Sequence, residues 1–131
     1  MYASANSKHT LTIFSDTSCP YCPNLHNEIN NLVSNDISVK YVLFSRNGND
    51  SDAYNDMVSV WCSKDKKKSL DELFDGSFIE SKTCDNPIDN NYAKAMNLKV
   101  NGTPMIFFGD GSVIPGYVSS DKIIEALKSK N

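Results

Sequence analysis

The chain has 131 residues, 40% of them hydrophobic, a size and composition suited to one domain with a single core. Its net charge of −3 at pH 7 excludes the strongly basic surface by which many nucleic-acid-binding proteins are recognised. No apolar run approaches the roughly 18 residues of a membrane-spanning helix, and residues 1–9 carry no apolar signal-peptide core.

The first part of the chain has the pattern of a strand–helix–strand unit. Residues 1–9 are polar and predict a flexible leader. Apolar residues then alternate, which predicts a strand over residues 10–15, and afterwards recur at the spacing of one helix face, which predicts a helix from about residue 20 to 34. The next strand, predicted over residues 37–44, is apolar on both faces, as expected for a central strand. These elements form a βαβ unit.

A helical insertion is predicted from about residue 50 to 86. Its first helix ends at Cys62, and its second opens with Ser69–Glu72, which has the form of a capping box. The basic run Lys66–Lys68 is interpreted as a solvated loop, and residues 77–87 as polar, irregular backbone. The predicted apolar face of the first helix consists of Ala53, Met57, Val60 and Trp61.

The last part of the chain predicts helix, two strands and helix. Pro87 starts the first of these helices, strands follow over residues 105–108 and 113–117, and Ser119 or Ser120 caps the final helix. The apolar side of the helix after Pro87 is predicted to hold Ile88, Tyr92, Ala95 and Met96. The predicted order is therefore β-α-β, a helical insertion, then α-β-β-α, an α/β fold.

The four cysteines divide into a close pair, Cys19 and Cys22, and a distant pair, Cys62 and Cys84. Three connectivities are possible, and the CxxC spacing favours 19–22 together with 62–84. A structural disulfide between Cys62 and Cys84 would indicate an oxidising compartment.

The CxxC motif lies where the first strand turns into a helix. Unpaired N–H groups and the helix dipole there favour an anion, which can lower a cysteine pKa from about 8.5 to roughly 3.5–7.5. Cys19 is accordingly predicted to be the nucleophilic thiolate, and Cys22 the more buried, resolving thiol. Pro20 suits the first helical turn, whereas Pro23 either delays the helix or distorts its first turn.

Two further observations bear on the site. A structural zinc would need Cys19, Cys22 and His26 with Cys62 or Cys84 as a fourth ligand, but the last two lack metal-like spacing, so no metal is predicted. His26 is interpreted as a surface helix residue rather than a proton shuttle.

Thr103-Pro104, just before a strand, is a candidate cis peptide, with a trans-proline loop as the alternative.

Five segments have a distinctive sequence: Asp16–Cys22 (DTSCPYC), Val60–Lys66 (VWCSKDK), Cys84–Asp85, Gly102–Pro104 and Val113–Tyr117 (VIPGY). Together they resemble the catalytic domain of the DsbC/DsbG family of bacterial periplasmic disulfide isomerases. The resemblance runs from about Thr10 to the C-terminus. It implies a thioredoxin fold over residues 10–131 with the helical insertion at about 50–86, and it implies no cofactor.

The resemblance also implies roles for individual residues. It places the catalytic pair at Cys19 and Cys22, with cis-Pro104 facing that pair and Thr103 beside it in the substrate groove. It also implies that Cys62 and Cys84 form a structural disulfide. Pro20 and Tyr21 are the active-site dipeptide, and they differ from the Gly-Tyr common in the family's isomerases. Because this dipeptide helps to set the redox potential, the choice between reductive and oxidative action stays open.

The function implied is thiol–disulfide exchange on exported proteins. Cys19 attacks a mispaired disulfide, and either a substrate thiol or Cys22 resolves the mixed disulfide. One alternative is a DsbA-like dithiol oxidase. Another is a non-catalytic thioredoxin-fold module that binds metal or client proteins.

The expected partners are misfolded or mispaired exported proteins and either a DsbD-like membrane thiol reductant or a DsbB-like membrane oxidase. The expected location is the periplasm, in which case this numbering begins after a leader was removed or replaced. The family also has an N-terminal dimerisation domain, which no segment before Thr10 can supply. The resemblance therefore leaves two alternatives, a catalytic fragment of a homodimeric protein or a natural single-domain relative.

Overall fold

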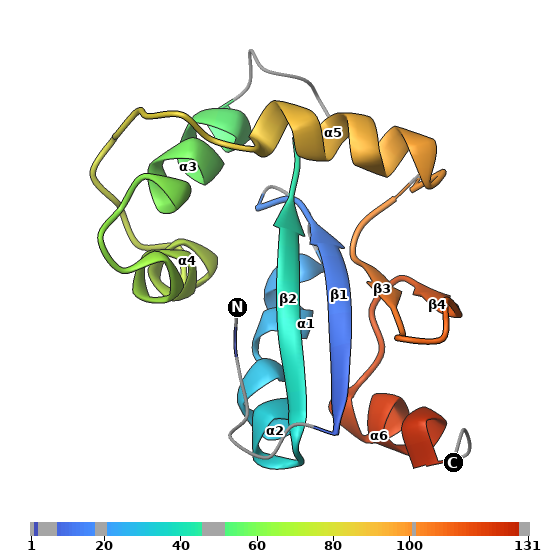
Figure 1. The fold of residues 1–131 in the computed structure, drawn as a ribbon. Coiled ribbons are helices and arrows are strands. Elements are labelled where there is room, and N and C mark those ends of the chain that lie inside the picture. Colours follow the sequence, from blue (N-terminus) through green and yellow to red (C-terminus); the bar gives the residue numbers. More distant parts are fainter. Residues whose placement is uncertain (1, 3–7, 18–20, 46–51, 101, 129–131) are drawn as a thin grey trace.

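A computed structural model describes Tyr2 and residues 8–17, 21–45, 52–100 and 102–128. Four strands form one mixed sheet in the order β2-β1-β3-β4 (Figure 1). β1 pairs in parallel with β2 and antiparallel with β3, and β3 pairs antiparallel with β4. The strands are β1 (His9–Ser15), β2 (Ile37–Leu43), β3 (Met105–Phe107) and β4 (Val113–Pro115).

The helices follow the predicted β-α-β, insertion, α-β-β-α order. Figure 1 shows α5 lying across the carboxyl ends of β1 and β2, with α3 and α4 beside β2. The six helices of the described residues are α1 (Cys22–His26), α2 (Ile29–Ser34), α3 (Asp52–Trp61), α4 (Lys66–Phe74), α5 (Ile88–Asn97) and α6 (Ser120–Lys128). Within the part of the chain that the structure describes, no helix is long and apolar enough to cross a membrane.

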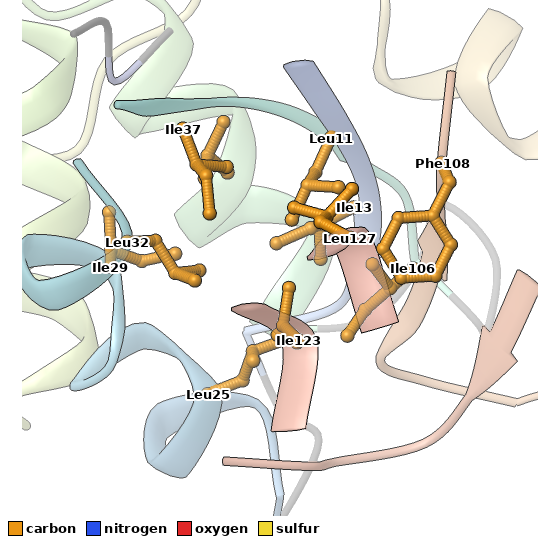
Figure 2. Close-up of a cluster of buried hydrophobic side chains, with 11 residues drawn as sticks. Leu11, Ile13, Leu25, Ile29, Leu32, Ile37, Ile106, Phe108, Ile123 and Leu127 are labelled. Carbon is orange, nitrogen blue, oxygen red and sulfur yellow. The ribbon is translucent and has the colours of Figure 1, made fainter. Parts of the chain in front are cut away.

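The largest buried cluster lies between the sheet and the helices α1, α2 and α6. Figure 2 shows apolar side chains from both layers converging there. Their burial supplies the main stabilisation of this layer, at about 1.5–3 kcal/mol for each fully buried large side chain. The buried members are Leu11, Ile13, Leu25, Ile29, Leu32, Ile37, Val39, Ile106, Phe108, Ile123 and Leu127.

The opposite face of β1 packs against α5. Phe14 lies edge-on to Phe44 and Phe107, with ring centroids 6.2 Å and 5.3 Å away, and Ala95 of α5 covers the same cluster. Alternate residues of β1 are thus buried on opposite faces, so β1 is the strand that is covered on both sides and paired on both edges.

The predicted central position of the second strand is wrong. β2 is an edge strand of the sheet, although buried residues occur on both of its faces, Ser38 on one and Val39 on the other. The insertion accounts for this burial at the edge of the sheet. Its helices α3 and α4, together with α5, form a separate apolar cluster that packs against Leu43. Apolar residues on both faces of a strand therefore indicate that other elements cover both faces. They do not indicate whether the strand is central or at the edge of the sheet.

The predicted flexible leader is anchored where it is described. The backbone N–H of Tyr2 donates to the carbonyl of Val39 (2.7 Å), and that of Val39 donates back to Tyr2 (2.7 Å). The N–H of Lys8 donates to the carbonyl of Asp36 (2.8 Å), and His9 already belongs to β1. Backbone hydrogen bonds, which need no apolar side chain, hold Tyr2 against β2 and Lys8 against Asp36.

The predicted start of α4 is also wrong. The helix begins at Lys66, because Asp65 accepts a hydrogen bond from the backbone N–H of Lys68 (3.1 Å) and acts as the N-cap. The Lys66–Lys68 run is therefore the exposed first turn of a helix rather than a loop. Ser69, which the capping-box interpretation placed at the cap, lies inside the helix.

The buried side of α5 differs from the prediction. Ile88 and Ala95 are buried, but Tyr92 and Met96 are exposed, and Asn91 takes the buried position between them. The side-chain amide of Asn91 donates to the carbonyl of Leu43 (2.9 Å) at the end of β2. A polar side chain thus joins the helix to the sheet where an apolar contact was expected.

Asn91→Ala is expected to lower the free energy of unfolding by about 1–3 kcal/mol, because the buried Leu43 carbonyl loses its amide donor. Urea titration measures the change. Asn90→Ala is the matched control, since Asn90 is an exposed residue of the same helix. Equal effects of the two substitutions would contradict the assigned role of the Asn91 bond.

Candidate active site

The predicted active-site tetrapeptide follows β1 and leads into α1. Asp16, directly after β1, is fully buried, so the chain enters the tetrapeptide from the core. Cys19 and Pro20 lie outside the described residues. Tyr21 is 60% exposed, whereas Cys22 is 1% exposed. The described half of the tetrapeptide therefore presents its tyrosine to solvent and its cysteine to the interior.

The helix behind the tetrapeptide begins at Cys22, about two residues later than predicted, with Tyr21 as its N-cap. Pro23 occupies the first turn, where its missing N–H interrupts no helical hydrogen bond. The predicted helix over residues 20–34 is also divided, because the N–H of Glu28 bonds to the carbonyl of Leu25 (2.9 Å), a three-residue step that breaks the α-helical ladder. The Glu28 carboxylate there accepts from Ser120 (3.0 Å).

A groove of 290 Å³ brings the tetrapeptide and the loop before β3 together. Tyr21 lines one side of it, and Thr103 and Pro104 line another, with Gly116 completing the wall after β4. The Thr103–Pro104 peptide bond is cis. Gly116 has a φ of +123°, a backbone conformation that L side chains rarely adopt. The residues that the sequence assigned to a substrate groove therefore share one surface depression next to Tyr21.

The distant cysteine pair forms a disulfide. The sulfurs of Cys62 and Cys84 are 2.01 Å apart, and their Cα atoms are 5.8 Å apart. The bond joins the end of α3 to the irregular segment before α5. This bond removes Cys62 and Cys84 as thiolate ligands, which weighs against the metal-binding alternative. Among the described residues, no group of three His, Cys, Asp or Glu side chains could hold a metal ion.

The interpretation of His26 as a surface residue is wrong. Its side chain is 9% exposed, its Nδ1 lies 2.8 Å from the hydroxyl of Tyr41, and its Nε2 lies 2.6 Å from Oδ1 of Asp71. The hydroxyl of Tyr2 donates to the same Asp71 oxygen (2.7 Å). The ring of Phe74 stacks at a tilt on the His26 ring, at 4.5 Å between centroids.

These partners of His26 were missed because they come from β2, α4 and the N-terminal segment. The partner Asp71 is 45 residues away along the chain. A tyrosine within an apolar strand was the available signal, since a buried hydroxyl needs a hydrogen-bond partner.

His26 has a lowered pKa. Burial lowers it below the ordinary 6.5, and the hydrogen bond and charge of Asp71, with the charge of Asp75, oppose part of that shift. The unfolded chain therefore binds a proton that the folded protein does not bind between the lowered value and pH 6.5. Folding stability from this residue is complete above pH 6.5 and is lost as the pH falls through that window.

His26→Phe is expected to remove this loss of stability at acidic pH. The free energy of unfolding of the unmodified protein should fall more steeply than that of the variant between about pH 7 and pH 5. Urea titrations at several pH values measure the two slopes, so a uniform change in stability caused by the substitution does not affect the comparison. Parallel slopes would contradict the lowered pKa.

The chain matches the thioredoxin-like domain family over residues 2–131. It is 36% identical over 127 residues to the thiol:disulfide interchange protein DsbC of Escherichia coli K12, covering 97% of this chain and 54% of that protein. It is 40% identical over 117 residues to DsbC of Salmonella typhimurium, covering 89% of this chain and 49% of that protein. The chain thus spans about half the length of the curated relatives it matches.

Solved structures show the same fold. A disulfide interchange protein from Neisseria gonorrhoeae superposes with a TM-score of 0.84 at 27% identity, covering 97% of this chain and 91% of that one. The catalytic domain of Proteus mirabilis ScsC superposes with a TM-score of 0.76 at 23% identity, covering 98% and 86%. The thioredoxin fold predicted from the sequence is confirmed, and the chain belongs to the thioredoxin-like domain family.

Proposed function

We propose that residues 10–131 are the catalytic domain of a DsbC-like thiol–disulfide oxidoreductase, with the helical insertion at about 50–86. The observation that carries the proposal is the groove in which Tyr21 of the CPYC tetrapeptide lies beside Thr103 and cis-Pro104. An extended peptide in this groove would bring its disulfide next to the tetrapeptide. Identities of 36% and 40% to two DsbC proteins support the same reading.

The proposed reaction begins at Cys19. Its thiolate attacks a substrate disulfide, so that a Cys19–substrate bond forms and the other substrate sulfur leaves as a thiolate. A second substrate thiol then releases the enzyme with a rearranged disulfide, or Cys22 attacks Cys19 and releases a reduced substrate. The 1% exposure of Cys22 suits the resolving role, because a buried sulfur is shielded from a bulky substrate.

The proposed substrates are exported proteins with mispaired disulfides, and the proposed location is the periplasm. The Cys62–Cys84 disulfide supports an oxidising compartment. A DsbD-like membrane reductant would keep the pair reduced for isomerisation. The Pro20-Tyr21 dipeptide differs from the Gly-Tyr common in the family's isomerases, which leaves a second candidate, a DsbA-like oxidase recharged by a DsbB-like membrane partner.

A refolding assay tests the proposal. The reduced chain is mixed with a protein whose disulfides have been scrambled, in a glutathione buffer, and recovery of the native substrate is followed. We expect recovery faster than with glutathione alone, and no acceleration by chain whose thiols were first alkylated. Equal rates with and without the active chain would reject the proposal. The reduction potential of the pair then separates isomerase from oxidase, since oxidases of this kind lie near −120 mV.

A further inference from the structure

The groove beside Tyr21 has two walls that come from distant parts of the chain. Tyr21 belongs to the tetrapeptide that leads into α1, whereas Pro115 and Gly116 lie where β4 ends. Residues 116–119 belong to no helix or strand and lead from β4 to α6. The position of the second wall therefore depends partly on the pairing of β4 with β3 and partly on the contacts that hold residues 116–119.

A carboxylate between α1 and α2 holds this segment. Glu28 accepts a hydrogen bond from the hydroxyl of Tyr117 at Oε1 (3.3 Å) and from the hydroxyl of Ser120 at Oε2 (3.0 Å). The side-chain amide of Asn31, on α2, donates to the Ser120 oxygen (2.6 Å). Glu28 and its neighbours on this side of the molecule thus hold both the residue that follows Gly116 and the first residue of α6.

The donors and acceptors of this set match. An ionised carboxylate only accepts hydrogen bonds, and each of its two oxygens here takes one hydroxyl proton. The Ser120 hydroxyl donates its single proton to Glu28 and accepts from the amide of Asn31. Among the residues that the structure describes, no lysine or arginine forms a salt bridge with Glu28. The role of this carboxylate therefore depends on the two hydroxyl groups.

Glu28 is also joined to the other wall of the groove, through the backbone of α1. The N–H of Leu25 donates to the carbonyl of Tyr21 (3.3 Å), and the N–H of Glu28 donates to the carbonyl of Leu25 (2.9 Å). Two hydrogen-bonded turns therefore separate Glu28 from Tyr21. The side chain of Leu25 is buried in the main core cluster, which fixes this part of the chain against the sheet.

Gly116 explains why the second wall needs an anchor. Its φ is +123°, and glycine has the widest range of backbone conformations, so backbone sterics alone restrict this point of the chain weakly. The hydrogen bond of Tyr117 follows the glycine directly, and Val118 packs against the main core cluster one residue later. Without the Tyr117 bond the segment should still fold, because Val118 keeps its packing, but its position at the groove should be less precise.

One side chain thus connects the helix that follows Tyr21 to the segment that carries Gly116. We propose that Glu28 is a positioning residue that sets the separation of the two groove walls through Tyr117, and thereby the recognition of the polypeptide around a substrate disulfide, an inference that rests on the function proposed above. Glu28 itself takes no part in the thiol exchange. A small disulfide without flanking peptide does not need both walls, so its reaction should not depend on Glu28.

The test compares two substrates of the reduced protein, a disulfide-bonded peptide with several residues on each side of its cysteines and hydroxyethyl disulfide, which has no peptide to contact the walls. The ratio of their second-order rate constants is the readout. Glu28→Ala removes both acceptor oxygens, and Tyr117→Phe removes one hydroxyl while keeping the ring. The matched controls are Glu125→Ala, at an exposed position of α6, and Tyr92→Phe, since Tyr92 and Tyr117 are both 40% exposed.

We expect Glu28→Ala to lower the rate constant for the peptide about tenfold, a factor equivalent to the net contribution of one hydrogen bond to a charged group. Tyr117→Phe should lower it by a similar or smaller factor. The rate constant for hydroxyethyl disulfide, and both rate constants in the control variants, should be unchanged. Combining Glu28→Ala with Tyr117→Phe should slow the peptide no further than Glu28→Ala alone, because the two side chains act through one bond.

An unchanged ratio in Glu28→Ala and Tyr117→Phe would overturn the inference, and so would an equal fall for both substrates, which would indicate a general structural effect on Cys19. Circular dichroism checks each variant, and Tyr117→Phe decides the question if Glu28→Ala does not fold. If the unmodified chain reacts with neither disulfide, the function proposed above fails and the inference fails with it. If the unmodified chain reacts with both and the variants keep its ratio, the inference alone is rejected.

Discussion

Cys19→Ala is expected to lower the rate constant for reaction with a disulfide-bonded peptide by at least about 1000-fold, because the attacking sulfur is lost. Cys22 cannot replace it, since that thiol is 1% exposed. Rapid-quench measurements with a peptide that changes fluorescence on reduction would give the rate constant.

Cys22→Ala is the control for this substitution. It should still attack the peptide and accumulate a mixed disulfide of the combined mass, which Cys19→Ala should never form. A Cys19→Ala protein that kept a tenth or more of the rate would show that the nucleophile was wrongly assigned.

Replacing both Cys62 and Cys84 by alanine is expected to lower the free energy of unfolding by about 3 kcal/mol in the chain-entropy model, given the 22-residue separation that the disulfide closes. The two cysteines tie the end of α3 to the segment before α5, which has no helix or strand of its own. Urea titration measures the loss.

The disulfide's effect should concern stability rather than chemistry, since Cys62 and Cys84 do not line the groove beside Tyr21. The double variant should therefore keep its rate of peptide reduction under conditions where it is folded. A loss of that rate in the folded variant would assign the second pair a redox role. A change in stability below about 1 kcal/mol would instead contradict the loop-closure argument.

Local patterns predicted the order of elements well. Alternation predicted β1, and the periodicity of apolar residues predicted the helical regions, although the helix predicted over residues 20–34 is divided into α1 and α2. The boundaries depended on competition between neighbouring signals. Asp65 and Ser69 could both begin α4, and the earlier residue caps it because its carboxylate reaches the N–H of Lys68. A sequence pattern does not rank two such caps.

Contacts between residues far apart in the chain could not be predicted from local sequence patterns. Asn91 is polar and was not expected inside, yet it is buried because the end of β2 offers it a carbonyl. His26 was assigned to the surface because its position on α1 was considered alone, whereas α4 and β2 cover it. The predicted site residues Tyr21, Thr103 and Pro104 do meet in one groove.

The position of β2 at the side of the sheet has a consequence for behaviour at high concentration. A strand with open N–H and C=O groups invites pairing with another molecule, which is a common start of aggregation. Tyr2 occupies two of those groups at Val39, and the exposed Lys40 places a charge beside them. Tyr2 and Lys40 therefore leave fewer open backbone groups on this edge for a neighbouring copy to pair with.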